Sequence, residues 1–312
     1  MRLYRRIPLL IALAALLAVP AGANAKVVIG ISDNKPEMFG DQRFQDLKAG
    51  WARNVVPWDG LRYADDRARL DAWMAGAKTH NVKVLIAFDR SRHGKKGPSA
   101  KALAAQLSAF IRRYPGQIKA VTVWNEPNVN MKRRTRDLAR MYKEQRSTLR
   151  RLGSQARGVK LLAADLVDRP DVNSWASRYL SDLRKQRVPR PRYWGLHNYI
   201  DVNNLTYKRT RSFISRVKGE VWLTETGGVV SRNNKSRTKF RGAGVAFQAR
   251  ATKYLLSTML RKNPRIKYVF IYHWSASESS RTASWDSALV DSNGSARPAL
   301  ENIKSYIRSG RP

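Results

Sequence analysis

The sequence contains no cysteine among its 312 residues, and this absence excludes several kinds of site. Without thiols there is no disulfide framework, no zinc–thiolate centre and no cysteine nucleophile. Histidine is scarce as well: there are four, and none forms an H-E-x-x-H pair. We therefore expect no catalytic metal site.

Long apolar runs are absent except at the N-terminus. Residues 7–19 are almost entirely apolar and follow a short basic segment with three arginines. Small residues at Ala23 and Ala25 then complete the pattern of a secretory signal peptide, with cleavage expected between Ala25 and Lys26. The run is short for a membrane span, although an uncleaved anchor is the alternative. We expect a protein that is secreted or associated with the cell wall, with no integral membrane segment after cleavage.

Acidic residues are few. Sixty Lys and Arg stand against 23 Asp and Glu, and the formal net charge is +37. Loss of the three signal-peptide arginines leaves +34. A positive charge of this size attracts polyanions without selecting one kind over another. Outside a cell this favours an anionic cell-wall polymer or an acidic glycan over a specific nucleic acid. A solvated basic surface without a role in binding is the alternative.

From Lys26 onward, strand-like and helix-like runs alternate eight times, which predicts one domain over residues 26–312. Eight such units favour an α/β fold in the form of a single (β/α)₈ TIM barrel, acting as a monomer. An open doubly wound sheet is the alternative, but no glycine-rich phosphate loop follows any strand. The expected strands are Val27–Ser32, Asn54–Trp58, Val82–Phe88, Val121–Trp124, Val159–Ala164, Tyr193–Tyr199, Glu220–Thr224 and Ile266–Trp274.

A barrel concentrates its chemistry where strands end, at the C-terminal face. Two of the seven glutamates, Glu126 and Glu225, fall at such ends. They belong to the fourth and seventh units, so their strands face each other across the mouth. A pair of carboxylates can hydrolyse a glycosidic bond, with one acting as an acid and the other attacking the sugar or activating water. Glu278, after the eighth strand, is kept as a reserve carboxylate.

These two glutamates lie in motifs that resemble those of clan A glycoside hydrolases. Trp124-Asn125-Glu126-Pro127-Asn128 is similar to the acid/base motif of the fourth strand, and Trp222-Leu223-Thr224-Glu225-Thr226-Gly227 to the nucleophile motif of the seventh. The resemblance implies a retaining glycosidase that needs no cofactor, acts on a β-linked poly- or oligosaccharide, and uses Glu126 as acid/base and Glu225 as nucleophile. Thr226-Gly227-Gly228 departs from the commoner pattern, which leaves the subfamily and the linkage open.

Further residues match supporting positions of that clan. Arg53 resembles its arginine beside the nucleophile, and Tyr199 the tyrosine that hydrogen-bonds the nucleophile. His197 resembles a histidine often found there; it is two residues before Tyr199 on the expected sixth strand, so the two share a face, and both reach the mouth if that face points into the barrel. The remaining expected contacts to sugar are the Asn125 amide and the rings of Trp58, Trp274 and Trp285, with Trp274 beneath the reacting sugar.

Each of these residues also has a purely structural interpretation. The alternatives are a surface position for Arg53, a hydrogen-bonded core position for His197, and core positions for the tryptophans. The chain as a whole has an alternative function too: a barrel that has lost turnover and binds a glycan or the cell wall through its charge. The sequence does not determine the sugar, the linkage, or endo versus exo action.

Overall fold

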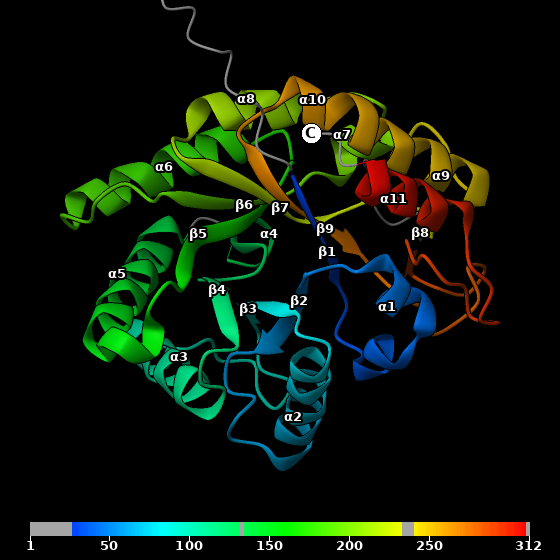
Figure 1. Ribbon diagram of the computed structural model, residues 1–312. Helices are drawn as coiled ribbons and strands as arrows, with labels where there is room; N and C mark the ends of the chain where they lie inside the picture. The colour runs from blue at the N-terminus through cyan, green and yellow to red at the C-terminus, as the bar shows by residue number, and fades with distance from the viewer. Residues whose placement is uncertain (1–26, 132–133, 233–239, 310–312) are drawn as a thin grey trace, which may run out of the picture.

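The computed structural model describes residues 27–131, 134–232 and 240–309, and eight parallel strands close into a barrel at its centre (Figure 1). Each strand pairs with the next in the chain, and the last pairs with the first over Val28–Ser32 and Tyr268–Tyr272. This is the expected TIM barrel. The barrel strands are β1 (Val28–Ser32), β2 (Trp51–Pro57), β3 (Lys83–Asp89), β4 (Ile118–Thr122), β5 (Lys160–Val167), β6 (Tyr193–His197), β7 (Glu220–Thr226) and β9 (Ile266–Tyr272).

Helices surround the barrel, as the outer ring of Figure 1 shows. Their apolar stripes face the strands, as in α5, where Leu138, Met141 and Tyr142 are buried at helical spacing. The helices are α1 (Gln42–Leu47), α2 (Ala64–Thr79), α3 (Ala100–Arg113), α4 (Pro127–Asn130), α5 (Thr135–Leu152), α6 (Val172–Lys185), α7 (Tyr199–Asn203), α8 (Lys208–Arg216), α9 (Val245–Tyr254), α10 (Leu260–Lys262) and α11 (Pro298–Ser309). Shorter helical turns are η1 (Pro36–Gly40), η2 (Gly153–Ala156) and η3 (Leu255–Met259).

Aromatic side chains fill the N-terminal half of the barrel. Trp51, near the start of β2, packs edge-on against Trp222 of β7, with ring centroids 5.6 Å apart. Phe270, Leu85 and Leu162 complete this buried cluster. Because large rings close this end, polar side chains can gather only towards the C-terminal ends of the strands.

Several elements differ from those expected. β4 begins three residues earlier, at Ile118, and β6 ends at His197, so that a separate helix, α7, begins at Tyr199. A small antiparallel pair, β8 (Ser231–Arg232) and β10 (Trp285–Asp286), was not foreseen. Two paired residues per strand are too few to show an alternating pattern.

The expected signal peptide, residues 1–25, lies outside the described residues. Among the described residues, no helix combines the length and the apolar character needed to cross a bilayer.

Candidate active site

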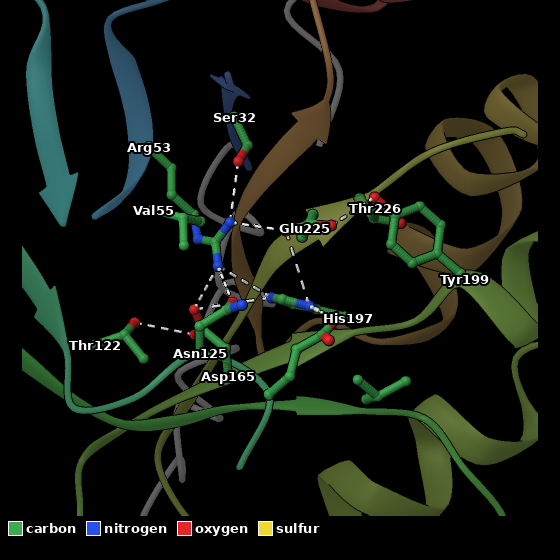
Figure 2. Close-up of polar contacts among 12 residues, drawn as sticks. Ser32, Arg53, Val55, Thr122, Asn125, Asp165, His197, Tyr199, Glu225 and Thr226 are labelled. Carbon is green, nitrogen blue, oxygen red and sulfur yellow. Dashed lines mark hydrogen bonds and ion pairs between the residues drawn. The ribbon is translucent and has the colours of Figure 1, made fainter. Parts of the chain in front are cut away.

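Arg53 is the centre of a polar cluster inside the C-terminal half of the barrel. Its side chain is fully buried on β2. Nη1 donates to Ser32 Oγ at 3.0 Å and to Glu225 Oε2 at 2.9 Å. Nη2 donates to Asn125 Oδ1 and Asp165 Oδ2, both at 2.8 Å. A buried arginine requires such partners, and here they come from β1, β5, β7 and the end of β4 (Figure 2).

Glu225 is the penultimate residue of β7 and receives donors at both carboxylate oxygens. Oε2 accepts from Arg53, and Oε1 accepts from the Tyr199 hydroxyl at 3.1 Å. The side chain is only 13% exposed. These two donors come from different elements and fix the Glu225 carboxylate in one orientation (Figure 2).

Glu126 lies across the mouth and is held differently. It adopts a left-handed backbone conformation, with φ at 47°, directly before α4. Pro127 begins that helix, where the missing N–H of proline is not needed. Asn128 then anchors the turn, because its side chain exchanges two hydrogen bonds with the backbone of Val167. A non-glycine residue in this conformation costs energy that the surrounding contacts must offset, and such residues concentrate at functional sites.

His197 connects the two glutamates. Its Nδ1 lies 2.9 Å from Glu126 Oε1 and 4.0 Å from Glu225 Oε2. One oxygen of each carboxylate and this nitrogen all lie within 4.8 Å of one another. Burial opposes a charged imidazole, but the nearby carboxylates of Glu225, Asp165 and Glu126 outweigh it and raise the pKa of His197 to about 9.

The charge on His197 acts on Glu126 in turn. Burial alone would raise the pKa of the Glu126 carboxyl. The hydrogen bond from His197, its charge, and the charge of Arg53 together lower that pKa below its ordinary value. At neutral pH the proton of this hydrogen-bonded pair therefore lies on His197, and Glu126 is ionised.

Asp165, on β5, is the member of the cluster that the sequence interpretation did not select. It is fully buried, accepts from Arg53, and also accepts from Thr122 Oγ1 at 3.0 Å. Burial opposes its charge, but Arg53 and His197 lower the pKa of Asp165 to about 2. Gly195 makes room for it, since a Cβ there would lie 1.9 Å from Asp165 Oδ1. A buried arginine needs a counter-charge, but several acids stand at strand ends, so this rule alone does not select Asp165.

Asn125 joins the cluster to the outer wall of the mouth. Its carbonyl oxygen faces Arg53, and its Nδ2 donates to Asp89 Oδ2 at 3.2 Å. Burial raises the pKa of the Asp89 carboxyl at the end of β3, more than its hydrogen bonds lower it. The expected place of Asn125 beside the two glutamates agrees with this geometry.

Tyr199 reaches Glu225 from α7 and not from a strand. The prediction that it shares a strand face with His197 is therefore wrong, because β6 ends at His197. The buried carboxylate of Asp168 accepts the backbone N–H groups of Ile200 and Asp201, and so fixes the first turn of α7. Burial raises the pKa of Asp168 to about 7.

Two expected sugar platforms do not lie in the mouth. The Trp274 ring is 1% exposed, packs edge-on against Phe44, and donates from Nε1 to Asp41 Oδ2 at 3.0 Å. Trp58 is 8% exposed and belongs to the hydrophobic core. Both predictions are corrected, since a covered ring offers no face to a sugar.

Trp285 is the tryptophan that lies beside the catalytic cluster. It is partly exposed on β10, and its ring meets that of Tyr199 at a centroid distance of 4.8 Å. Glu278, the reserve carboxylate, is exposed in the loop after β9. The structure thus brings together Arg53, Asn125, Glu126, His197, Tyr199 and Glu225, and leaves Trp58, Trp274 and Glu278 outside.

Two groups of described side chains have the spacing of metal ligands. The first is Glu126, His197 and Glu225, and the second is Asp65, Asp66 and His93. Arginines already pair with both: Arg53 with Glu225, and Arg69 and Arg92 with Asp66. A guanidinium at the ligand oxygens opposes a second cation, so neither group is assigned to a metal.

Comparisons with known proteins agree with this architecture. The model of the glycosyl hydrolase catalytic core family matches residues 78–302. Among solved structures, a Penicillium canescens endo-1,4-beta-xylanase, XylE, is similar, with a TM-score of 0.67 at 15% identity over 93% of this chain and 96% of that chain. A GH53 catalytic domain from Ignisphaera aggregans has a TM-score of 0.63 at 15% identity, over 93% of this chain and 98% of that chain. A Croceicoccus marinus glucosidase has a TM-score of 0.65 at 12% identity, over 93% of this chain and 69% of that chain. No curated protein sequence matches the chain.

Proposed function

The chain belongs to the glycosyl hydrolase catalytic core family and is a clan A glycosidase, and we propose that it cleaves β-linked glycans with retention of configuration. Glu225 is the proposed nucleophile and Glu126 the acid/base. One observation carries this proposal: the two carboxylates face each other across the mouth with an oxygen of each within 4.8 Å of the other.

The separation supports retention. Retaining glycosidases hold their carboxyl groups about 5–5.5 Å apart, whereas inverting ones leave about 6.5–9.5 Å for a water molecule. The oxygens of Glu126 and Glu225 that lie within 4.8 Å of each other are closer than the inverting range, which favours direct attack on the sugar carbon.

The contacts of the two carboxylates favour Glu225 as the nucleophile and Glu126 as the acid/base. Glu225 is held by Arg53 and Tyr199 and is 13% exposed, as suits a nucleophile that must keep its orientation. Glu126 has one side-chain partner, His197, and is 28% exposed. It can exchange a proton with a leaving oxygen or a water, and the His197–Glu126 pair supplies that proton.

The expected reaction has two steps. Glu225 attacks the sugar carbon while Glu126 protonates the departing oxygen, and a glycosyl ester on Glu225 results. A water then enters, Glu126 removes its proton, and the ester is hydrolysed. The names of the similar proteins, xylanase and glucosidase, make β-xylosides and β-glucosides the first substrates to try.

We propose in addition that the protein is exported and works outside the cell membrane, on the basis of the apolar N-terminal run and its alanine-flanked end. The partly exposed Trp285 is the proposed sugar platform, in place of Trp274, because it lies beside Tyr199.

Activity on aryl β-glycosides and on β-linked polysaccharides tests the catalytic proposal. Wild-type protein is compared with Glu126→Ala, with Glu225→Ala and with the matched surface variant Glu301→Ala. We expect both site variants to lose activity by about a thousandfold or more, while Glu301→Ala stays at the wild-type level. If wild type and Glu225→Ala are equally inert on the whole panel and both bind glycans, the alternative of a binding barrel without turnover replaces the proposal.

A further inference from the structure

A large groove opens beside the catalytic mouth. Its volume is about 1620 Å³, larger than the 300–1,000 Å³ typical of pockets for small molecules. Its walls are formed by the ends of β2 and β3, by the end of α4 and by the first half of α5. The loop 90–101, whose last two residues begin α3, completes them. It therefore lies on the same face of the barrel as the two glutamates, on the side of β3 and β4.

The groove is joined to the catalytic cluster through one hydrogen bond. Asp89 lines the groove, and its Oδ2 accepts from Asn125 Nδ2 at 3.2 Å. Asn125 also bonds to Arg53, and it precedes Glu126 in the chain. Trp124 lines the groove as well. A chain that lies in the groove therefore ends next to the acid/base.

The walls combine apolar and cationic side chains with three acidic ones, Asp89, Asp137 and Glu144. Val55, Pro57 and Met131 give apolar surface on which sugar rings can rest. The loop 90–101 carries five Lys or Arg and no acid, and the whole stretch between Asp89 and Glu126 contains none. This local imbalance exceeds the general excess of basic residues in the chain.

Most of these cations are available to a ligand. The Lys95, Lys96, Lys101 and Arg134 side chains are exposed, and none makes an ion pair with a described residue. Among the other cations of the loop, Arg92 pairs with Asp66 at 2.8 Å, and Arg90 Nε lies 4.0 Å from Asp89 Oδ1. Unpaired cations on one rim attract an anion without first having to break an existing ion pair.

The groove continues away from the mouth. A second hollow of about 420 Å³ shares Lys101 and Glu144 with it and runs between α3 and α5. Arg112 and Arg151 line this extension. A track that leads from the mouth over the outside of two helices fits a polymer, not a single sugar.

We propose that this groove binds an anionic glycan chain, with acidic sugars against the cations of the loop 90–101 and the adjoining sugar at Glu126 and Glu225. The proposal rests on the glycosidase function above and names its substrate class. The acidic groups lie outward on the rim, because at the inner end the Asp89 carboxyl would repel them. Rings without charge suit that junction.

Binding measured by calorimetry tests the proposal independently of turnover. The probes are oligogalacturonates, which carry carboxylates, sulfated dextran oligosaccharides, and neutral xylo-oligosaccharides of the same length. The groove variant is Lys95→Glu/Lys96→Glu. The matched control is Arg190→Glu/Lys218→Glu, which makes the same change in charge at exposed positions before β6 and β7, at the opposite end of the barrel.

We expect the groove variant to bind at least one class of anionic oligosaccharide about tenfold more weakly than wild type, and the control to change by less than about twofold. The class affected identifies the acidic group, carboxylate or sulfate. Two results would overturn the proposal, because the groove would then respond to net charge alone. The first is an equal loss of oligosaccharide affinity in the groove variant and the control variant. The second is displacement of the bound oligosaccharide by a DNA duplex of similar charge equally well in all proteins. Failure of the proposed function is a separate result. In that case Glu225→Ala would match wild type in hydrolysis, while the groove variant would still bind the anionic oligosaccharide more weakly than the control variant.

Discussion

Arg53 and Asp165 form an ion pair that no solvent reaches: Nη2 and Oδ2 are 2.8 Å apart, and both side chains have 0% exposure. Arg53 also holds Glu225, and Asp165 also approaches His197 Nε2 at 3.8 Å. This pair therefore supports both proposed catalytic carboxylates, Glu225 directly and Glu126 through His197. The site depends on a buried charge balance that spans β2, β5, β6 and β7.

Arg53→Met should be strongly destabilising. It leaves Asp165 buried without a counter-charge, and breaking a buried pair in this way costs about 3–5 kcal/mol. Chemical denaturation measures this loss, with Arg178→Met, an exposed arginine of α6, as the control at less than about 0.5 kcal/mol. Arg53→Lys should fall in between, because one ammonium cannot bond to both carboxylates in the fork geometry of arginine. Equal stability of Arg53→Met and the control would show that the pair contributes nothing.

Gly195→Ala should disturb the site through Asp165. The added methyl group would meet Asp165 Oδ1 at 1.9 Å and the Ala164 carbonyl at 2.8 Å, so the carboxylate must shift away from Arg53. We expect a loss of about 1–3 kcal/mol in stability together with reduced kcat. Gly40→Ala is the control, since nothing lies within 4 Å of its added methyl group. A fully active, fully stable Gly195→Ala protein would contradict the assigned role of Asp165.

His197 predicts a specific dependence of stability on pH. Its pKa is about 9 in the folded protein against an ordinary value of 6.5, so the folded state binds the proton more tightly. The resulting stabilisation, roughly 3 kcal/mol, is complete below about pH 6.5 and is lost as the pH rises through 9. The Tm of wild type should therefore fall between pH 6.5 and 9.5, and that of His197→Asn should fall much less. His80→Asn, at an exposed histidine, should keep the wild-type slope.

Tyr199→Phe separates activity from stability. It removes the hydroxyl donor to Glu225 Oε1 and should lower kcat/KM about 10- to 100-fold, with little change in Tm. Tyr179→Phe provides the contrast, because that hydroxyl donates to the Ala163 carbonyl in the core at 3.0 Å. It should cost about 1 kcal/mol in stability and leave kcat unchanged. If both variants behave alike, the Tyr199 hydroxyl has only a structural role.

The sequence predicted the barrel and most of its site because both depend on regular patterns. Alternating apolar and amphipathic runs gave the eight units, and parallel closure brought the ends of β4 and β7 to one face. Glu126 and Glu225 could then be placed without knowledge of any loop. Arg53 was selected by its resemblance to the clan's arginine beside the nucleophile.

The errors arose where position depends on distant packing. Trp274 was expected in the mouth, but its ring lies between Phe44 and Asp41, residues far away in the chain whose approach no local pattern reveals. Asp165 stood at a strand end like several other acids, and only the three-dimensional position of Arg53 selects it. The groove beside the mouth also depends on loop shape, although its excess of cations was visible in the sequence.

We propose that Glu225 forms a covalent bond to the sugar. Mass spectrometry after incubation with activated 2-deoxy-2-fluoro-β-glycosides tests it most directly, because the fluorine slows hydrolysis of the ester while a good leaving group keeps its formation fast. The predicted result is a mass gain of one fluoroglycosyl unit, located by peptide mapping on Glu225 and absent in Glu225→Ala. A protein that hydrolyses the unfluorinated glycosides but forms no adduct, or forms it on Glu126 or Glu278, would contradict the account.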